Sequence, residues 1–273
     1  MKAHRRRTRG VAGFLAAFAV PTAALLAVSI ATASRSGATG SSAGGSTTAD
    51  CANVFGGDVC VSAAVASDRV LEVGVTVPMR TIEAASSDGG MVWPPVRLGA
   101  LAMPAEVRRL TGLQFFDIYW EPHGHPPGSY LVPHFDFHLY GVTLGEATSI
   151  DCADETRPKR LPPGYALPNI EVPDIGTLVG ICVPAMGMHA VPERELKDAA
   201  PFEATMLVGY YHGRPIFLEP MIARDRLLRR ESFDLPVPAI PEASHSVRFP
   251  TAFRAEYHAD ARAYRLVFTG FGH

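Results

Sequence analysis

From Asp58 onward the chain alternates apolar and polar residues with a period of two, and turn-forming residues interrupt the alternation at short intervals. Successive side chains of a strand point to opposite faces, so this period is typical of strands with one buried face. The 25 Gly and 23 Pro residues favour many turns and few long helices. The pattern predicts a mainly β fold, a single antiparallel β-sandwich or barrel-like domain over residues 51–273 with a few short helices.

Strands and helices can be placed by this pattern. Strands are expected at residues 59–65, 70–77, 111–120, 132–143, 177–183, 202–211, 214–218, 251–258 and 264–268, and short helices at 104–110, 193–199 and 222–230. The stretch 151–175 holds five prolines and little alternation, so it is expected to be a long surface loop.

The first 33 residues read as an export signal. A basic segment at residues 4–9 precedes an apolar run at 11–30 and the small residues Ala31, Thr32 and Ala33, which is typical of a signal peptide. The run is also nearly long enough to span a bilayer, so an uncleaved anchor is the alternative. Both interpretations predict an exported protein, either secreted or membrane-anchored, whose membrane contact comes only through this segment if it is uncleaved.

Residues 34–50 are rich in Gly, Ser and Thr and are predicted to be a flexible linker. Residues 1–33 carry five basic residues and no acidic one, so 20 basic and 27 acidic residues follow, with a formal charge near −7. Nucleic-acid binding needs a clustered basic surface, and this composition therefore excludes a nucleic-acid partner.

All four cysteines follow the linker, and an even number in an exported chain predicts two disulfides. Three pairings are possible. The preferred one joins Cys51 to Cys60, which bracket a short Gly-containing turn, and Cys152 to Cys182, which would staple the long loop. The sequence contains no close CxxC pair, so nothing indicates a thiolate metal site.

Six of the ten histidines lie between residues 123 and 212. In the segment PHFDFHL at 133–139, strand alternation puts two histidines and an aspartate on one face and apolar side chains on the other. Imidazole and carboxylate groups together suit a divalent Zn, Mn, Fe or Cu ion, which cannot be distinguished from the sequence. The predicted metal ligands are His134, Asp136, His138 and His189.

Strand geometry restricts how these residues share an ion. Residues i and i+4 of a strand are about 13 Å apart, so His134 and His138 bind one ion only if the strand bends. The preferred plan takes one adjacent pair from this strand and adds His189 with Glu219 or His125. Glu219 lies among apolar residues, where a carboxylate needs a metal, an Arg or a hydrogen-bond donor. The competing interpretation is a half-buried edge strand whose polar face meets water.

Four phrases together resemble an exported bacterial family of unknown function, typified by a Thermus protein of a sigma-E regulon. They are WEPHGHPPGSY (120–130), VPHFDFHLY (132–140), PAMGMH (184–189) and GYYHGRPIFLEPMI (209–222). The resemblance implies a mainly β domain of a secreted or anchored protein that assembles into rings, with no settled activity. The residues carried over are His125, His134, Asp136, His138, His189 and Glu219.

The chain is more loosely similar to cupins, in which two short His-bearing motifs on different strands bind one metal. Here the first motif would be 134–138 and the second 184–189, so a cupin-like domain is expected. The sequence departs from the cupin pattern, because the first motif reads HxxxH rather than HxH and no Glu follows at the expected interval.

No Walker-type loop, dinucleotide fingerprint or HExxH is present, so no familiar reaction is predicted. The favoured function is a divalent-metal-binding extracytoplasmic protein, either an enzyme or a binder. The alternative is a non-enzymatic structural or interaction protein of the cell envelope, without metal and assembling as a homo-oligomer. A weaker third hypothesis is a pH sensor that uses the clustered histidines.

Overall fold

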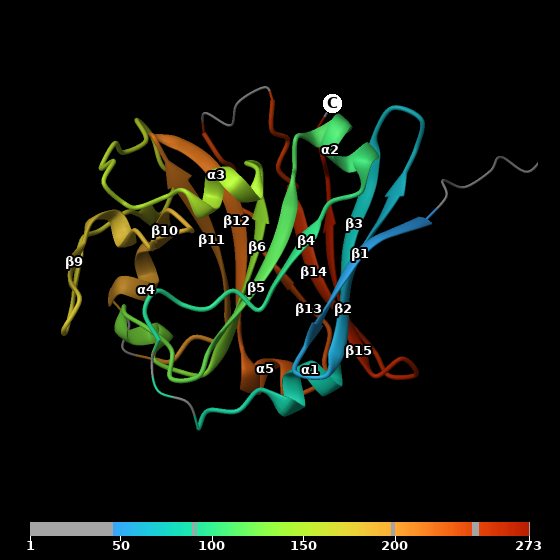
Figure 1. Ribbon diagram of the computed structural model, residues 1–273, viewed down its shortest axis with the longest axis horizontal. Coiled ribbons are helices and arrows are strands. Elements are labelled where there is room, and N and C mark those ends of the chain that lie inside the picture. The colour runs from blue at the N-terminus through green and yellow to red at the C-terminus, as the bar shows by residue number, and fades with distance from the viewer. Residues whose placement is uncertain (1–45, 89, 91, 198–199, 242–245, 273) are drawn as a thin grey trace, which may run out of the picture. The chain divides into compact units, whose positions relative to one another are not determined.

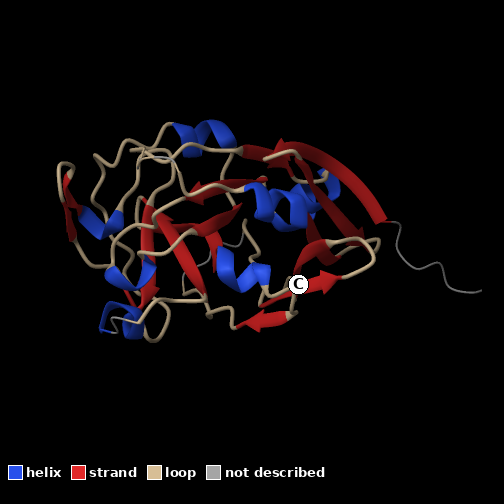
Figure 2. Ribbon diagram, turned by 90° about the horizontal axis from the view of Figure 1, so that it is seen from below, coloured by secondary structure: helices blue, strands red, loops and turns tan. Residues whose placement is uncertain are grey.

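The computed structural model describes residues 46–272 apart from 89, 91, 198–199 and 242–245. The predicted leader and most of the predicted linker therefore lie outside the described residues. The fold is mainly β, as predicted, and its two large sheets are antiparallel throughout (Figure 1). Figure 2 shows the helices as short segments among longer stretches of strand and loop. No helix of the described residues is long and apolar enough to cross a bilayer.

The first sheet combines the beginning and the end of the described chain. Its six strands, in spatial order, are β1 (Ser46–Val54), β2 (Gly57–Val65), β3 (Val70–Pro78), β15 (Ala263–Thr269), β14 (Ala252–His258) and β13 (Phe233–Leu235). The strands predicted at 59–65, 70–77, 251–258 and 264–268 are confirmed, and they pair as the hairpins β2–β3 and β14–β15. Strand β1 begins at Ser46, inside the range predicted as linker, because its backbone pairs with β2 and such pairing does not depend on composition.

The second sheet carries the histidine-rich strand in its interior. Its seven strands, in spatial order, are β4 (Gly99–Ala102), β5 (Phe115–Glu121), β6 (His134–Tyr140), β12 (Arg214–Ala223), β11 (Ala204–Tyr211), β10 (Met188–Pro192) and β7 (Tyr165–Ala166). Strand β6 pairs with β5 on one side and with β12 on the other. The interpretation of residues 132–143 as an edge strand is therefore wrong.

The two large sheets share one hydrophobic core. Phe116 of β5 and Phe268 of β15 meet edge to face with ring centroids 6.3 Å apart. Phe137 of β6 stacks on Phe116 from the neighbouring strand, at 6.0 Å. Side chains alternate along β6, so its phenylalanines face this core while its histidines and aspartate occupy the opposite face of the sheet. The sandwich-like arrangement therefore leaves one face of the second sheet to be covered by other segments.

Most of the covering segments come from the long excursion that follows β6, and residues 92–95 add to them. It contains β8 (Ile170–Val172) and β9 (Gly176–Leu178), which form a separate two-stranded sheet, and the 3₁₀ helix η2 (Val179–Ile181). In Figure 1, β9 lies at the far left and the six-stranded sheet lies at the right. The strand predicted at 177–183 is confirmed only at residues 177–178, because the chain turns into η2 after β9, where Gly180 and Ile181 adopt positive φ.

The remaining elements are short. They are α1 (Met79–Ala84), α2 (Ala105–Thr111), η1 (Gly128–Tyr130), α3 (Leu144–Thr148), α4 (Glu193–Lys197) and α5 (Arg224–Leu228). The strand predicted from residue 111 begins only at Phe115, because Thr111 ends α2 and Gly112 caps it in the left-handed region. The helix predicted from residue 222 begins at Arg224, because β12 continues through Pro220 to Ala223.

Both predicted disulfides are present. Cys51–Cys60 joins the neighbouring strands β1 and β2. Cys152–Cys182 connects the start of the excursion with the residue that follows η2. The second disulfide therefore closes the chain segment that covers the polar face of the seven-stranded sheet.

Candidate metal centre

A pocket of about 50 Å³ lies between the polar face of the seven-stranded sheet and the segments that cover it. This volume exceeds the ~10–15 Å³ that one water molecule needs, so the pocket has room for an ion with further ligands. Its polar lining consists of Glu121, His125, Tyr130, Asp136, His189 and Glu219. The rest of the lining is apolar and comes largely from residues 92–95, β8–β9 and the segment after β9.

Strand pairing brings the polar side chains together. All seven residues of β6 are buried, including His134, Asp136 and His138. Residues directly opposite on paired strands share a face, and β5 places Glu121 opposite His134 and Asp117 opposite His138. The result is a row of ionisable side chains with almost no contact with water.

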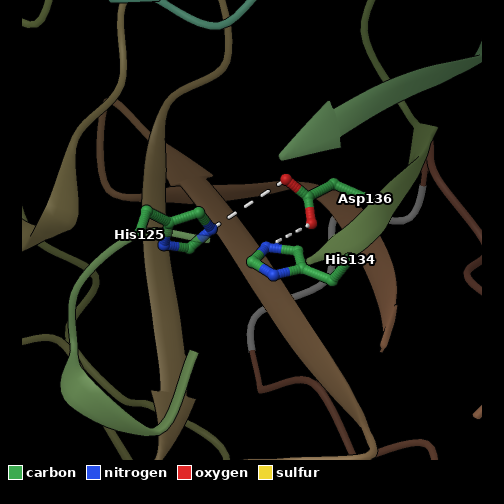
Figure 3. A group of neighbouring side chains, drawn as sticks. All are labelled: His125, His134 and Asp136. Carbon is green, nitrogen blue, oxygen red and sulfur yellow. Dashed lines mark ion pairs between the residues drawn. The ribbon is translucent and has the colours of Figure 1, made fainter. Parts of the chain in front are cut away.

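The first group contains His125, His134 and Asp136 (Figure 3). The carboxylate of Asp136 lies between the two rings. Its Oδ1 is 3.2 Å from Nε2 of His134, and its Oδ2 is 3.9 Å from Nε2 of His125. His134 and Asp136 come from one strand, whereas His125 comes from the preceding loop. We call this set the aspartate triad.

The second group contains His138, His189 and Glu219, one residue from each of β6, β10 and β12. Oε2 of Glu219 is 3.5 Å from Nε2 of His138 and 3.7 Å from Nε2 of His189. All three side chains are buried. We call this set the glutamate triad, and it repeats the arrangement of one carboxylate between two imidazole Nε2 atoms.

Backbone carbonyls orient three of the four rings. Nδ1 of His134 lies 2.7 Å from the oxygen of Val132, and Nδ1 of His189 lies 2.9 Å from that of Ile181. Nδ1 of His125 lies 2.9 Å from the oxygen of Pro126. A carbonyl oxygen only accepts, so each Nδ1 carries the hydrogen and donates it, and Nε2 of the neutral ring presents a lone pair.

The ring of His138 faces a carboxylate instead of a backbone carbonyl. Its Nδ1 lies 3.0 Å from Oδ1 of Asp117, a fully buried side chain. Nε of Arg97 donates to Oδ2 of Asp117 at 2.9 Å, and Nη2 of Arg97 donates to the carbonyl of Ala185 at 3.2 Å. This arrangement points Nε2 of His138 at Glu219, and a partner of this kind typically fixes the orientation of a metal-binding imidazole.

Several buried acceptors face one another without a donor. Nε2 of His134 and Oδ1 of Asp136 have no hydrogen-bond partner among the described residues, and neither do Nε2 of His138 and Oε2 of Glu219. A lone pair opposed to a carboxylate oxygen in a buried site costs free energy unless a proton or a cation lies between them. Each triad therefore has the ligand atoms and the electrostatic need for a positive charge.

The pKa values of the glutamate triad reflect this crowding. Burial raises the pKa of Glu219 well above its ordinary value, since the nearby charge of His138 only partly opposes it. Burial lowers the pKa of His138, but the carboxylates of Glu219 and Asp117 outweigh this effect and raise it to about 9. Burial and the proximity of His138 lower the pKa of His189 to about 3. In the absence of metal, a proton on His138 supplies positive charge to this triad.

In the aspartate triad the pKa of the carboxylate shifts in the opposite direction. Burial acts to raise the pKa of Asp136, but His134 and His125 outweigh it, so the pKa is lowered and the carboxylate stays charged. Burial, and then the proximity of His134, lower the pKa of His125. Glu121 lies beside this triad, and burial together with the charge of Asp136 raises its pKa to about 8.

The structure divides the predicted ligands into two sets. His134 and Asp136 lie together, whereas His138 joins His189, in keeping with the strand geometry that separates His134 from His138. His125 and Glu219, predicted as alternative ligands, are full members of the two triads. Sequence reasoning missed Asp117, Glu121 and Arg97, although period-two alternation in FFDIYWE (115–121) already places the two acidic residues on one face.

Comparison of the chain with protein-family models, with curated proteins and with solved structures found no significant match.

Proposed function

We propose that this protein binds divalent transition-metal ions, one in each triad, at the base of the apolar pocket. The observation that carries the proposal is the pairing of each buried carboxylate with two imidazole Nε2 atoms at 3.2–3.9 Å. Two ligand atoms that bind one ion at about 2.1 Å lie roughly 3.0–3.4 Å apart at tetrahedral or octahedral angles. Shifts of about half an ångström or less would bring the carboxylate–imidazole distances to this spacing, and all ligand atoms of a triad already lie within 4.8 Å of one another.

The ligand chemistry supports a borderline divalent ion. Two histidines and one carboxylate suit Zn, Mn, Fe or Cu, and all four cysteines are in disulfides and therefore are not thiolate ligands. Three protein ligands leave at least one coordination position for water or another ligand. His125, Asp136, His189 and Glu219 line the pocket, so the open positions would face it.

The protein is also proposed to be exported. The leader at residues 1–33 and the linker after it are the sequence features that favour delivery out of the cytoplasm. The two disulfides are compatible with an extracytoplasmic location, where oxidised cysteines persist. Fractionation of cells that express the full chain tests this part, and recovery in the cytoplasm with reduced cysteines would contradict it.

Metal content tests the site itself. The full chain, oxidised and without a His tag, is stripped with chelator, reloaded with Zn²⁺ or Mn²⁺ and analysed by elemental mass spectrometry. The wild type is expected to hold about two equivalents, and Asp136→Asn and Glu219→Gln are each expected to lose about one, because each removes one triad carboxylate.

A matched control is available on the surface. Glu256 lies 3.5 Å from Nε2 of His258 in an exposed pair of the same two residue types, so Glu256→Gln should keep both equivalents. Wild-type protein that folds but binds no metal contradicts the proposal and favours the metal-free envelope protein. Loss of all metal in either single variant contradicts binding of one ion in each triad.

A further inference from the structure

We infer that the pocket receives a small, largely apolar molecule that coordinates the bound metal through one compact polar head group. This inference rests on the proposed metal binding and adds the class of ligand. Three features of the pocket support it: the side chains of its lining, the position of the polar ones and the position of its opening.

The walls contain almost nothing that could recognise a polar ligand. The described residues that line the pocket include no Lys, Arg, Asn, Gln, Ser or Thr. A phosphate or a polyanion would therefore find no basic side chain, and a sugar would find no array of hydrogen-bonding groups for its hydroxyls. Burial of apolar surface is the interaction that these walls offer.

The polar groups of the lining are concentrated at the metal site. His125 and Asp136 belong to one triad, and His189 and Glu219 belong to the other. Tyr130 is already engaged, because its hydroxyl donates to Oε2 of Glu195 at 2.6 Å. A ligand that enters this pocket must therefore place its polar end against the triads.

Glu121 is the remaining polar residue of the lining. It lies opposite His134 on β5 and is 6% exposed. Its Oε1 has no hydrogen-bond partner among the described residues. The position suits a second contact to the head group of the ligand and does not extend the polar surface up the walls.

Exposure of the apolar lining shows where the pocket opens. Leu207 and Val191 on the sheet are fully buried, whereas Trp93, Ile175 and Leu178 on the covering segments are half-buried. The polar base is therefore deep, and an apolar tail would leave past the β8–β9 hairpin. The cavity volume of about 50 Å³ limits the ligand to a small aliphatic or aromatic molecule.

A series of straight-chain hydroxamates tests the inference, because the head group stays constant while the apolar tail grows. Acetyl, butyryl and hexanoyl hydroxamates are titrated into Co²⁺-loaded protein, and the visible absorption of the metal reports coordination. Each methylene buried in the pocket is expected to tighten binding about fourfold until the chain reaches the opening. Methylphosphonate, which has a more highly charged head, is expected to bind no tighter than acetohydroxamate.

Two variants distinguish the contribution of the pocket wall to ligand binding from that of the metal. Ile175→Ser should reduce the gain in affinity from the longer chains while leaving acetohydroxamate binding and metal content unchanged. Leu71→Ser, at a partly exposed leucine of the other sheet, should change none of these. Normal metal content with affinity that does not rise with chain length overturns the inference but not the proposed function. Failure to load metal overturns the proposed function and the inference with it.

Discussion

Nε2 of His138 and Oε2 of Glu219 face each other at 3.5 Å in the buried face of the seven-stranded sheet, and neither atom has a hydrogen-bond partner among the described residues. The two residues belong to adjacent strands, β6 and β12, so the contact follows directly from strand pairing. When the His138 ring is neutral, this contact places the lone pair of its Nε2 against the carboxylate of Glu219. Under the proposed function this position holds either a proton or a metal ion, and both states can be measured.

The carboxylate of Asp117 lies against Nδ1 of His138, so Asp117→Asn should weaken metal binding without removing a ligand. The substitution keeps the shape of the side chain but removes the charge that faces Nδ1 of His138 at 3.0 Å. Loss of such a partner typically lowers metal affinity about 10–100-fold. Competition with a chromophoric chelator measures the change, which should be confined to the glutamate triad.

The control for this substitution is Asp154→Asn. Asp154 contacts Nδ1 of His212 in a partly exposed pair, and neither residue lines the pocket. Its loss should leave metal affinity unchanged. Equal affinity in wild type and Asp117→Asn would mean that Asp117 only balances charge in the core.

Removal of metal should make stability depend on pH above neutrality. His138, with a pKa of about 9, and Glu121, with a pKa of about 8, hold a proton more tightly in the folded chain than in the unfolded chain. A raised pKa contributes stability that is complete at low pH and is lost as pH rises through the folded value. The free energy of unfolding of the metal-free protein should therefore fall between pH 6.5 and 9.

Glu121→Gln isolates one part of this dependence. The variant has no carboxyl proton to lose at position 121. Between pH 6.5 and 8 its free energy of unfolding should therefore fall less steeply than that of the wild type, with slopes that differ by about 1.4 kcal/mol per pH unit. His189, with a pKa lowered to about 3, acts only below pH 6.5 and does not affect this window. Urea unfolding in chelator at several pH values gives the slopes, and identical slopes would refute the role of Glu121.

The two disulfides should differ in their contribution to stability. Cys152 and Cys182 are 30 residues apart, whereas Cys51 and Cys60 are 9 apart. A longer closed loop restricts the unfolded chain more, with expected values of about 3.6 and about 2.6 kcal/mol. Urea unfolding of the two double Cys→Ala variants should therefore rank the Cys152–Cys182 variant as the less stable.

Loss of Cys152–Cys182 should also weaken metal binding. Cys182 directly follows Ile181, whose carbonyl accepts the hydrogen bond from Nδ1 of His189. Metal affinity at the glutamate triad is expected to drop in the Cys152→Ala/Cys182→Ala variant but not in the Cys51→Ala/Cys60→Ala variant. The opposite ranking in either measurement would contradict this account.

Gly209→Ala should damage the glutamate triad through a neighbouring ring. A Cβ atom at Gly209 would lie 1.9 Å from Cε1 of Phe217. The Phe217 ring packs against His138 and His189 with centroid distances of 4.8 and 5.1 Å. The ring must move, at a cost of roughly 1–3 kcal/mol for an overpacked core.

Metal titration of this variant should show a weaker glutamate triad and an unchanged aspartate triad. Gly145→Ala is the control, because a Cβ atom there meets nothing within 4 Å and the residue lies in helix α3. It should be neutral or slightly stabilising, since Ala favours helix. Normal stability of Gly209→Ala would show that Phe217 can shift without cost.

Local patterns in the sequence were sufficient for much of the fold. Period-two alternation predicts the hairpins β2–β3 and β14–β15, because each pairs strands that are neighbours in the chain. The same alternation places His134, Asp136 and His138 on one face of one strand. The preferred disulfide pairing is also correct, since the short turn and the long loop that it closes are both visible in the sequence.

Tertiary structure decided what that polar face became. From alternation alone, this row of polar side chains could equally belong to a solvent-facing edge strand. Because β6 is buried between β5 and β12, the row instead forms a buried site. Pairing between distant segments sets Glu219 and His189 beside His138, and a loop adds His125 to His134 and Asp136. Sequence periodicity fixes the face on which a side chain lies, whereas the partner opposite depends on the register of long-range strand pairing, which no local pattern encodes.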